Sequence, residues 1–391
     1  MREVYADHAA TTPVAPEVVA AMAPFLAERF GNASSVHGRG QAAREAIEDA
    51  RARVADLIGA TPEEIVFMAS GSEANNLALK GLLQGATPER RRLVVSAIEH
   101  PSVLETARHL ESRGFTLTIV PVGSDGIVEP ERVQAVLGPD VALVSVMWVN
   151  NETGTIQPVA EIGRLARAAG ARFHCDAVQA AGKLPIDVQA AGADLLSLAA
   201  HKLYGPPGAA ALYVRRRTRL IPLVHGGHQE RSRRAGTENL AALVGFGLAA
   251  TRTAERLGSD EPRLLAALGE RLLEGLVRAI PDTRLNGDPA RRLATLVNLR
   301  FAGVDGEAAL HELDQVGVTV STGSACSAAA PGPSHVLTAM GLRPEDAHAS
   351  VRFSLGTGSS TPDVERILEV TPPVIGRLRA LAGRGTMKRS A

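Results

Sequence analysis

The sequence predicts an α/β protein built on a mainly parallel sheet that helices cover on both faces. Three observations support this fold class. Short apolar runs recur along the first 240 residues, amphipathic stretches separate them, and turn-forming residues bound most of the runs. Strands that alternate with helices are typical of parallel sheets, because each parallel connection has to cross back over the sheet.

The predicted elements follow one another in a regular order. Apolar residues at helical spacing predict a first helix over residues 40–58. Amphipathic stretches predict further helices over residues 101–112 and 158–169. Short apolar runs predict strands at residues 65–68, 93–96, 141–149, 172–175, 195–198 and 209–214.

The alternation fades after about residue 240, which predicts a second domain. Residues 240–279 are rich in Ala and Leu and predict a long helical region, and we place the domain boundary within it. Mixed strands and helices follow, up to a helix near residues 362–382. The expected division is a large domain of residues 14–250 and a smaller α+β domain of residues 1–13 and 251–391.

The composition argues against several classes of protein. The chain has 391 residues, 45% of them hydrophobic, and 42 Lys and Arg residues balance 42 Asp and Glu residues. Without net charge, nothing global favours nucleic acid or an anionic membrane as a partner. No apolar run approaches the roughly 20 residues of a membrane span, and the N-terminus lacks the apolar segment of a secretory signal. Two cysteines do not make a disulfide framework, so we expect a soluble, reduced, cytoplasmic protein.

A lysine after a predicted strand is the first candidate for chemistry. Lys202 follows the apolar run 195–198 and precedes a Gly-Pro-Pro-Gly turn. An unpaired lysine is costly to bury, whereas sheet enzymes place their ligands at strand ends. Lys202 is therefore a candidate for a Schiff base, and a surface lysine in a loop is an equally good interpretation of this segment alone.

An acid ends another apolar run, 26 residues before that lysine. Asp176 follows residues 172–175, where a carboxylate would suit the pyridinium nitrogen of pyridoxal phosphate (PLP). With its nitrogen protonated, the PLP ring acts as an electron sink. Taken alone, the segment fits better with Asp176 as the N-cap of a following helix.

The turn at residues 69–76 predicts an anion site. It follows the strand at 65–68 and opens a helix, where free backbone N–H groups and the helix dipole attract anions. Ser72 adds a hydroxyl group. The Gly-Lys-Ser/Thr ending of a P-loop is absent. A capping box of Ser70 with Glu73 is an alternative that can coexist with anion binding.

A histidine and a cysteine complete the candidates. His100 follows a predicted strand and is placed to stack on a planar cofactor and to move protons near neutral pH, although a lone histidine is more often structural. Cys326 lies among small residues between Gly323 and Pro331. Structural cysteines usually lie in apolar cores, as we expect for Cys175, so Cys326 is a candidate nucleophile.

Together these segments resemble the cysteine desulfurases, which have the class V aminotransferase fold. The resemblance covers nearly the whole chain. It implies a PLP-dependent transferase of fold type I, with a mainly parallel seven-stranded sheet in the large domain and a smaller α+β domain. Further motifs carry the resemblance in order: Asp7-His8-Ala9-Ala10-Thr11-Thr12, Gly31-Asn32-Ala33-Ser34-Ser35-Val36-His37, Asn150-Asn151-Glu152-Thr153-Gly154, Gly226-Gly227-His228-Gln229-Glu230, Arg234-Ala235-Gly236-Thr237-Glu238-Asn239 and Val351-Arg352-Phe353-Ser354-Leu355-Gly356.

The resemblance implies a role for each candidate residue. Lys202 would hold PLP as a Schiff base, Cys326 would accept the sulfur, and His100 would stack on the ring as acid and base. Arg352 would clamp the substrate carboxylate, which suits guanidinium geometry, with help from Asn150. No metal is expected. The other implied contacts are Asp176 with the pyridinium nitrogen, Gln179 with the phenolic oxygen, and Gly71, Ser72, His201 and a second subunit's Thr237 with the phosphate.

Two positions depart from the family's pattern. Ala199 and Ala235 stand where the family usually has serines near the phosphate. Each missing hydroxyl removes a hydrogen bond worth on the order of 1 kcal/mol. We therefore expect the phosphate to be held by fewer hydroxyl groups in this chain.

The implied function is PLP-dependent removal of sulfur from L-cysteine, giving L-alanine and a persulfide on Cys326. The sulfur would pass from a homodimer to an acceptor protein, such as an iron–sulfur scaffold, or into tRNA or cofactor thiolation. A selenocysteine lyase or a transaminase is the alternative on the same fold, and a transaminase has no need for Cys326. A non-catalytic scaffold is a further alternative, against which Lys202, Asp176 and His100 argue. The proton acceptor for Cys326 stays open between the substrate, His100 and His335.

Overall fold

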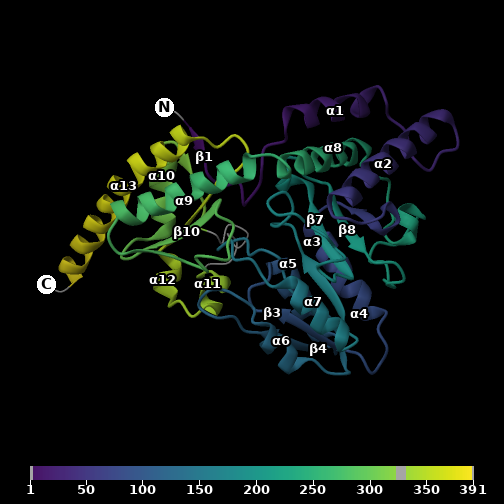
Figure 1. Cartoon of the computed structure of the whole chain (residues 1–391), viewed down its shortest axis with the longest axis horizontal. Helices are drawn as coiled ribbons and strands as arrows, with labels where there is room; N and C mark the ends of the chain where they lie inside the picture. The colour runs from purple at the N-terminus through teal and green to yellow at the C-terminus, as the bar shows by residue number, and fades with distance from the viewer. Residues whose placement is uncertain (1–2, 323–331, 390–391) are drawn as a thin grey trace.

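The computed structural model describes residues 3–322 and 332–389, with side chains described up to residue 382. These residues form two lobes, and Figure 1 shows both ends of the chain on the same lobe. Helices α8 (Leu240–Leu257) and α9 (Glu261–Ala279) lead from one lobe to the other. Within the described residues, no helix combines the length and the apolar character that a membrane crossing requires.

The first lobe is built on a seven-stranded sheet with the order β2-β8-β7-β6-β5-β3-β4. Neighbouring strands are parallel except at β8, which runs antiparallel to β7 and β2. This confirms the predicted α/β class and its mainly parallel sheet. The strands are β2 (Ile65–Met68), β3 (Arg92–Ser96), β4 (Thr116–Val120), β5 (Val141–Ser145), β6 (Arg172–Asp176), β7 (Leu195–Ala199) and β8 (Ala210–Val214).

Two strands differ from the prediction. The apolar run 141–149 gives only β5, because the chain after Ser145 turns toward a cavity that Met147 and Val149 line. Strand β4 was not predicted at all. It is the edge strand of the sheet, and most of its residues are at least partly exposed, so its sequence lacks a continuous apolar run.

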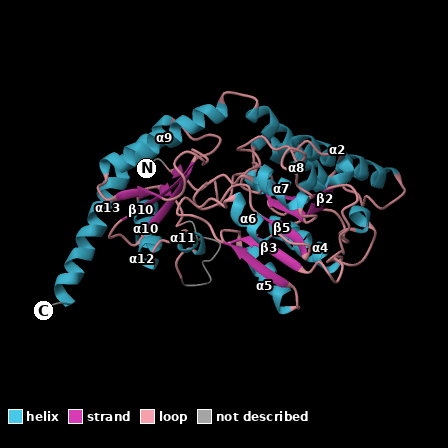
Figure 2. Ribbon diagram, turned by 60° about the horizontal axis from the view of Figure 1, so that its bottom comes forward, coloured by secondary structure: helices cyan, strands magenta, loops and turns pink. Residues whose placement is uncertain are grey.

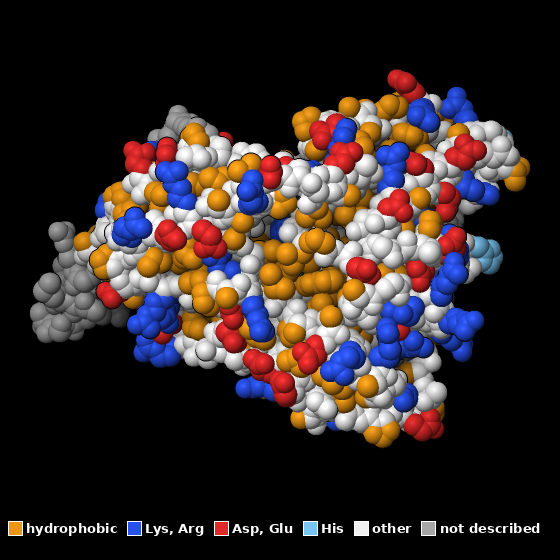
Figure 3. Space-filling model, in the orientation of Figure 1, with side chains coloured by type: hydrophobic (Ala, Val, Ile, Leu, Met, Phe, Trp, Pro, Cys, Tyr) orange, Lys and Arg blue, Asp and Glu red, His pale blue; other side chains and the backbone are white. Residues whose placement is uncertain are grey.

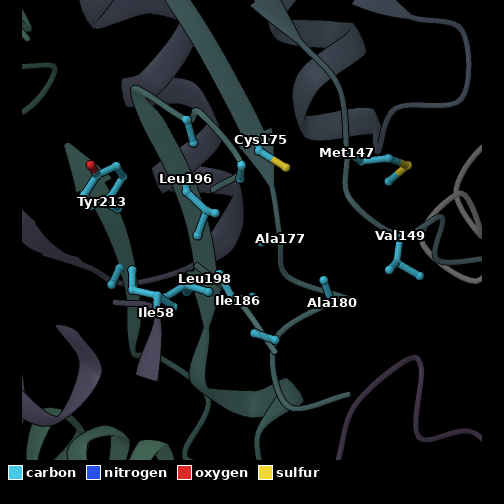
Figure 4. Close-up of a cluster of buried hydrophobic side chains, with 14 of the residues drawn as sticks. Ile58, Met147, Val149, Cys175, Ala177, Ala180, Ile186, Leu196, Leu198 and Tyr213 are labelled. Atoms are coloured by element: carbon cyan, nitrogen blue, oxygen red, sulfur yellow. The ribbon is translucent and has the colours of Figure 1, made fainter. Parts of the chain in front are cut away.

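Helices cover both faces of this sheet (Figure 2). Side chains alternate between the faces: Val94 and Val144 join one apolar cluster, and their neighbours Leu93 and Leu143 join the other. Figure 4 shows part of the first cluster, in which Cys175 lies among aliphatic side chains. The covering helices are α1 (Pro16–Ala27), α2 (Gly38–Leu57), α3 (Gly71–Asn76), α4 (Leu82–Gln84), α5 (Pro101–Ser112), α6 (Pro130–Val136), α7 (Val159–Ala168) and α8, with a π-helical turn η2 (Leu77–Gly81) and 3-10 turns η1 (Pro62–Glu64), η3 (Ala200–Lys202) and η4 (Gln229–Ser232).

The second lobe has its own apolar core, made by α9, the strands around it and α13. Its sheet is antiparallel with the order β12-β10-β9, and β1 pairs with β11 beside it, so the N-terminal strand belongs to this lobe. The elements are β1 (Val4–Tyr5), β9 (Thr283–Leu285), β10 (Leu296–Phe301), α10 (Gly306–Gln315), β11 (Val318–Thr319), α11 (His335–Ala339), α12 (Pro344–His348), β12 (Ser350–Ser354) and α13 (Thr361–Arg389).

The predicted long helical region is two helices, not one. Gly258 follows α8, and Pro262 lies in the first turn of α9, which are common signals for a helix end and a helix start. Apolar residues of α8 pack in the first lobe and those of α9 in the second. We therefore propose that the two lobes are the two domains, with their joint at residues 258–260.

The surface carries charges of both signs over both lobes (Figure 3). On the face shown there, hydrophobic side chains gather in the middle, between the lobes. The even spread of charge agrees with the zero net charge of the sequence.

Candidate active site

A cavity of about 620 Å³ opens at the carboxyl ends of the parallel strands. Loops that follow β2, β3, β5, β6 and β7 converge there, where ligands bind in open α/β sheets. Among the described residues, the second lobe contributes Arg352 from β12, and Ala9 and Ala10 come from the segment that follows β1. The lining side chains and segments are Ala9, Ala10, Ser70, Gly71, Ser72, Asn75, His100, Ser102, Met147, Val149, Asn151, Asp176, Val178, Gln179, Ala199, His201, Lys202 and Arg352.

Lys202 reaches the cavity from η3, directly after β7. Its ammonium group donates hydrogen bonds to the carbonyl oxygens of Ala9 and Ala10, at 2.6 Å for Ala10. The N-terminal segment thus crosses the site and holds the lysine against its wall. Lysine at this strand end lines a cavity and is not a surface side chain in a loop.

Asp176 ends β6 and is 5% exposed. Its Oδ1 accepts the backbone N–H of Val178 at 3.0 Å, and its Oδ2 accepts an N–H of Asn75 at 2.7 Å. No helix begins at Asp176 in the structure, so the alternative of a helix N-cap does not apply. Two donors hold the carboxylate in one orientation at the cavity wall.

Sequence reasoning missed Asn75. This residue lies on α3, is buried, and donates from the same amide nitrogen to Asp176 and to Ser102 Oγ, the latter at 2.8 Å. One signal was present: two consecutive asparagines, Asn75 and Asn76, stand inside a helix, where asparagine is unfavourable because it competes with the backbone for hydrogen bonds.

His100 caps the N-terminus of α5. Its Nδ1 accepts the backbone N–H of Ser102 at 3.1 Å and lies 2.8 Å from Ser102 Oγ. Burial lowers the pKa of His100, Lys202 and His335 lower it further, and Asp176 opposes them. His100 therefore has a structural capping role and lines the cavity as well.

The turn before α3 also has two roles. Ser70 Oγ accepts the backbone N–H of Glu73 at 3.1 Å, and the Glu73 carboxylate accepts the N–H of Ala69 at 2.7 Å and an N–H of Arg234 at 2.9 Å. These bonds occupy the cap, while Gly71 and Ser72 line the cavity. Capping and a cavity-facing turn coexist, as the sequence allowed.

Two further predicted residues meet the N-terminal segment. Gln179 donates from Nε2 to Ala9 O at 2.7 Å, while its Oε1 is buried without a partner in the described residues. His201 Nδ1 lies 3.1 Å from Thr11 Oγ1. Burial, and secondly the charges of Lys202 and Lys183, lower the pKa of His201 to about 4. Both residues line the cavity.

Arg352 is nearly buried at the cavity wall, with its side chain 3% exposed. One guanidinium nitrogen donates to Asn151 O and another to Asp7 Oδ1, each at 2.7 Å. Its Nε is buried without a partner among the described residues. Asp7, from the N-terminal motif, therefore orients the arginine, which sequence reasoning did not foresee.

Asn150, which the resemblance assigns to substrate binding, forms a turn next to the cavity. Asn150 does not line the cavity: its Oδ1 accepts the N–H groups of Glu152 and Thr153, and its Nδ2 donates to Ile98 O. Asn151 lines the cavity instead. The first asparagine of the pair thus closes the turn, and its expected contact with the substrate stays a prediction.

One other predicted residue, Thr237, is not in this cavity. Thr237 lines a separate, smaller cavity beside Phe67 and Met68. Cys326 lies outside the described residues. Cys175 is fully buried on β6, and burial raises the pKa of its thiol well above the usual value. Its expected structural role in the core agrees with this environment.

Two ionisable residues lie behind the cavity wall in the interior. Burial raises the pKa of Glu99 to about 8, and its Oε1 accepts Ser96 Oγ–H and the Met147 N–H. Burial lowers the pKa of His174 to about 4, and its ring lies between two serine hydroxyls. Near pH 7 both are mainly uncharged and add little charge beside Asp176.

The second lobe is tied to the cavity wall at the start of α11. Ser334 Oγ donates to the buried carboxylate of Glu152 at 2.5 Å, and His335 Nε2 lies 2.9 Å from Glu99 O. In the described structure His335 thus contacts the backbone next to His100. Its suggested assistance to Cys326 stays a prediction.

A second cavity, of about 260 Å³, lies at the joint between α8 and α9 and shares Lys202 with the first. Lys183 lines it, and its Nζ is shielded from solvent without a partner among the described residues. Burial, and secondly the charge of Lys202, lower the pKa of Lys183 to about 7. Within the described residues no group of three or more His, Cys, Asp and Glu side chains is arranged to hold a metal ion.

This fold and site agree with the comparisons with known proteins. A family model described as Aminotransferase class-V matches residues 4–367, and the chain therefore belongs to this family. The cysteine desulfurase IscS of Methanosarcina thermophila is 45% identical over 381 residues, 97% of this chain and 94% of that protein. The cysteine desulfurase NifS of Azotobacter vinelandii is 43% identical over 380 residues, 97% and 94% of the two chains.

Solved structures of similar proteins agree with this family assignment. A NifS-like protein superposes with a TM-score of 0.91 at 33% identity, covering 96% of this chain and 100% of that one. The structure of SspA in complex with cysteine gives a TM-score of 0.81 at 38% identity, covering 90% and 98%. The predicted fold type and the resemblance to cysteine desulfurases are confirmed.

Proposed function

We propose that this chain is a cysteine desulfurase that takes sulfur from L-cysteine, releases L-alanine and holds the sulfur as a persulfide on Cys326. The observation that carries the proposal is the convergence of Lys202, Asp176, His100 and Arg352 on one cavity. The lysine, the acid and the histidine suit PLP chemistry, and the arginine suits the carboxylate of an amino acid.

The residues present fit PLP. Asp176 is held by two donors, and no basic side chain among the described residues is bonded to it, so its carboxylate is suited to a pyridinium nitrogen. Gln179 donates one hydrogen of its amide NH₂ group to Ala9 O, and the second hydrogen would be able to reach a phenolic oxygen. Ser72 and His201 line the same cavity and would hold the phosphate, without a hydroxyl at Ala199. When bound, PLP supplies an electron sink for the carbanion formed at the substrate's α-carbon.

The chain's own residues bind the substrate and move its protons. Arg352, oriented by Asp7, receives the substrate carboxylate, and Asn151 lies beside it in the wall. Lys202 takes the α-proton, since its amine enters the cavity at the strand end. His100 lines the same cavity and would stack on the cofactor beside the reacting part of the substrate.

Cys326 accepts the sulfur. As a thiolate it attacks the sulfur of bound cysteine: an S–S bond forms, and the bond between sulfur and the substrate's β-carbon breaks. The three-carbon unit takes up a proton at its β-carbon, regains the proton held by Lys202 at its α-carbon, and leaves as alanine. Cys175 is unsuited to this step, because its thiol is buried on β6 and its raised pKa disfavours the thiolate.

A mass-spectrometric experiment tests the proposal. After incubation with L-cysteine, the peptide containing Cys326 should carry an extra sulfur atom. Cys326→Ala should keep bound PLP but lose sulfur transfer almost entirely, and Cys175→Ala is the matched control that should still form the persulfide. Extra sulfur on Cys175, or normal desulfuration by Cys326→Ala, would contradict the mechanism.

We further propose a cytoplasmic homodimer that hands the persulfide sulfur to an acceptor protein, such as an iron–sulfur scaffold. The names of the relatives, IscS and NifS, motivate the scaffold. The position of Thr237 outside the larger cavity fits a contact with the neighbouring subunit's phosphate site. Co-purification of partners identifies the acceptor.

A further inference from the structure

A line of hydrogen bonds joins the acid of the site to its histidine. Asp176 Oδ2 accepts from Asn75 Nδ2 at 2.7 Å, and the same nitrogen donates to Ser102 Oγ at 2.8 Å. Ser102 Oγ in turn lies 2.8 Å from His100 Nδ1. These residues come from β6, α3 and the start of α5, and all four line the larger cavity.

The direction of each bond follows from which atoms carry hydrogens. The carboxylate of Asp176 accepts only, so the amide of Asn75 must turn its NH₂ group toward it. The second hydrogen of that NH₂ group goes to Ser102 Oγ, which is therefore an acceptor from Asn75. The hydroxyl hydrogen of Ser102 is left to donate to His100 Nδ1.

A second donor reaches the same ring nitrogen. The backbone N–H of Ser102 also points at His100 Nδ1, at 3.1 Å, and a backbone N–H never accepts. A nitrogen that receives two donors has no room for a hydrogen of its own. The ring proton of His100 must therefore be on Nε2, for which no described residue is an acceptor.

We propose that Ser102 is a positioning residue that fixes His100 as the neutral tautomer protonated at Nε2, so that His100 meets the bound substrate as a hydrogen-bond donor and not as a base. The inference rests on the proposed function for its substrate, and it narrows the acid and base role implied by the family resemblance. It leaves Lys202 as the base of the larger cavity.

Burial of the His100 ring agrees with a neutral ring. Burial lowers the pKa of His100, as do the charges of Lys202 and His335, while Asp176 alone raises it. A second ring proton would have to sit on Nδ1, against the hydroxyl and the N–H of Ser102. The cap of α5 therefore opposes the doubly protonated ring.

Nitrogen-15 spectroscopy of histidine-labelled holoenzyme tests this directly, because protonated and unprotonated ring nitrogens have well-separated chemical shifts. The His100 signals are assigned by their absence in His100→Gln. We expect an unprotonated Nδ1 and a protonated Nε2 in the wild-type enzyme. A protonated Nδ1 in the resting holoenzyme would overturn the proposal.

Variants at position 102 supply the second readout. Ser102→Ala removes the hydroxyl donor, so a fraction of His100 should shift its proton to Nδ1, and kcat should fall roughly two- to tenfold, as expected for one lost hydrogen bond, with little change in KM. Ser102→Thr keeps the hydroxyl and should restore both the wild-type ring signals and the wild-type kcat. Unchanged ring signals in Ser102→Ala would also overturn the proposal. An enzyme with the Nε2 tautomer that does not release alanine from cysteine would refute the proposed function and leave this inference standing.

Discussion

The larger cavity and the smaller cavity at the α8–α9 joint share Lys202 in their walls but differ in how their other charged groups are paired. In the larger cavity, Arg352 is bonded to Asp7 and Asn151, and Asp176 to Asn75 and the backbone of Val178. Each group is thus oriented before a ligand arrives, which is the condition for efficient binding and catalysis.

In the smaller cavity, the paired arginine is bonded to structural groups of the protein and is not positioned for a ligand. Arg292 donates to Glu270 and to neighbouring backbone carbonyls, so it fastens the loop before β10 to α9. Lys183 has no partner among the described residues, and burial depresses its pKa. The polar groups of the larger cavity are therefore oriented for a ligand. In the smaller cavity, Arg292 stabilises the joint and Lys183 weakens it.

Replacing each of the two lysines in turn gives the largest expected difference in activity. Lys202→Ala should abolish the yellow colour of bound PLP and lower alanine production by roughly a thousandfold or more, because the Schiff-base amine and the base are both lost. Absorbance spectra and alanine release measure the two effects. Lys183→Met is the control and should keep the colour. A Lys202→Ala enzyme that turned over near the wild-type rate would remove the basis of the PLP assignment.

Two of the buried arginines, Arg352 and Arg292, provide a second, smaller contrast. Arg352→Lys keeps the charge but loses the planar fork, so kcat/KM for L-cysteine should fall roughly 10- to 100-fold, mainly through KM, as for one or two charge-assisted hydrogen bonds.

The matched variant Arg292→Lys should leave KM near the wild-type value and lower the denaturation midpoint instead, since its partner Glu270 is structural. Steady-state kinetics and urea titrations of both variants measure this separation. If Arg292→Lys raised KM as much as Arg352→Lys, the proposed division between the cavities would be wrong.

The parts of the site at strand ends were predictable from sequence. Lys202 and Asp176 stand at the ends of predicted strands, and the carboxyl ends of parallel strands meet at one edge of a sheet, so their convergence follows from the fold class. The sheet itself was predicted for the same reason, except for the edge strand β4, whose partly exposed residues break the apolar pattern.

The partners of these residues were not predictable. Asn75 meets Ser102 across α3 and α5, 27 residues apart, and nothing in either local sequence specifies the other. Which asparagine of the pair Asn150 and Asn151 lines the cavity depends on the turn that Asn150 closes, and the local sequence does not specify that turn. From sequence, Lys183 looks like an ordinary loop lysine, because the residues that bury it lie on α8 and α9, far along the chain.

The smallest effect expected is on stability, and it concerns Lys183. Its pKa falls from 10.5 to about 7 in the folded protein, so between those values the unfolded chain binds one more proton than the folded one. The contribution of Lys183 to stability therefore rises with pH across this window, and its full cost is present below about pH 7. Lys183→Met removes the buried amine and should stabilise the protein by about 1–3 kcal/mol at and below that pH, with the gain shrinking at higher pH. Urea denaturation at about pH 6, 7 and 9 measures the trend.

Lys80→Met is the matched control, because the ammonium of Lys80 already donates to Asn76 at 2.7 Å and should give no such gain. A Lys183→Met variant that was less stable than the wild type below pH 7 would mean that the second cavity holds a partner for this lysine, and the contrast between the two cavities would fail.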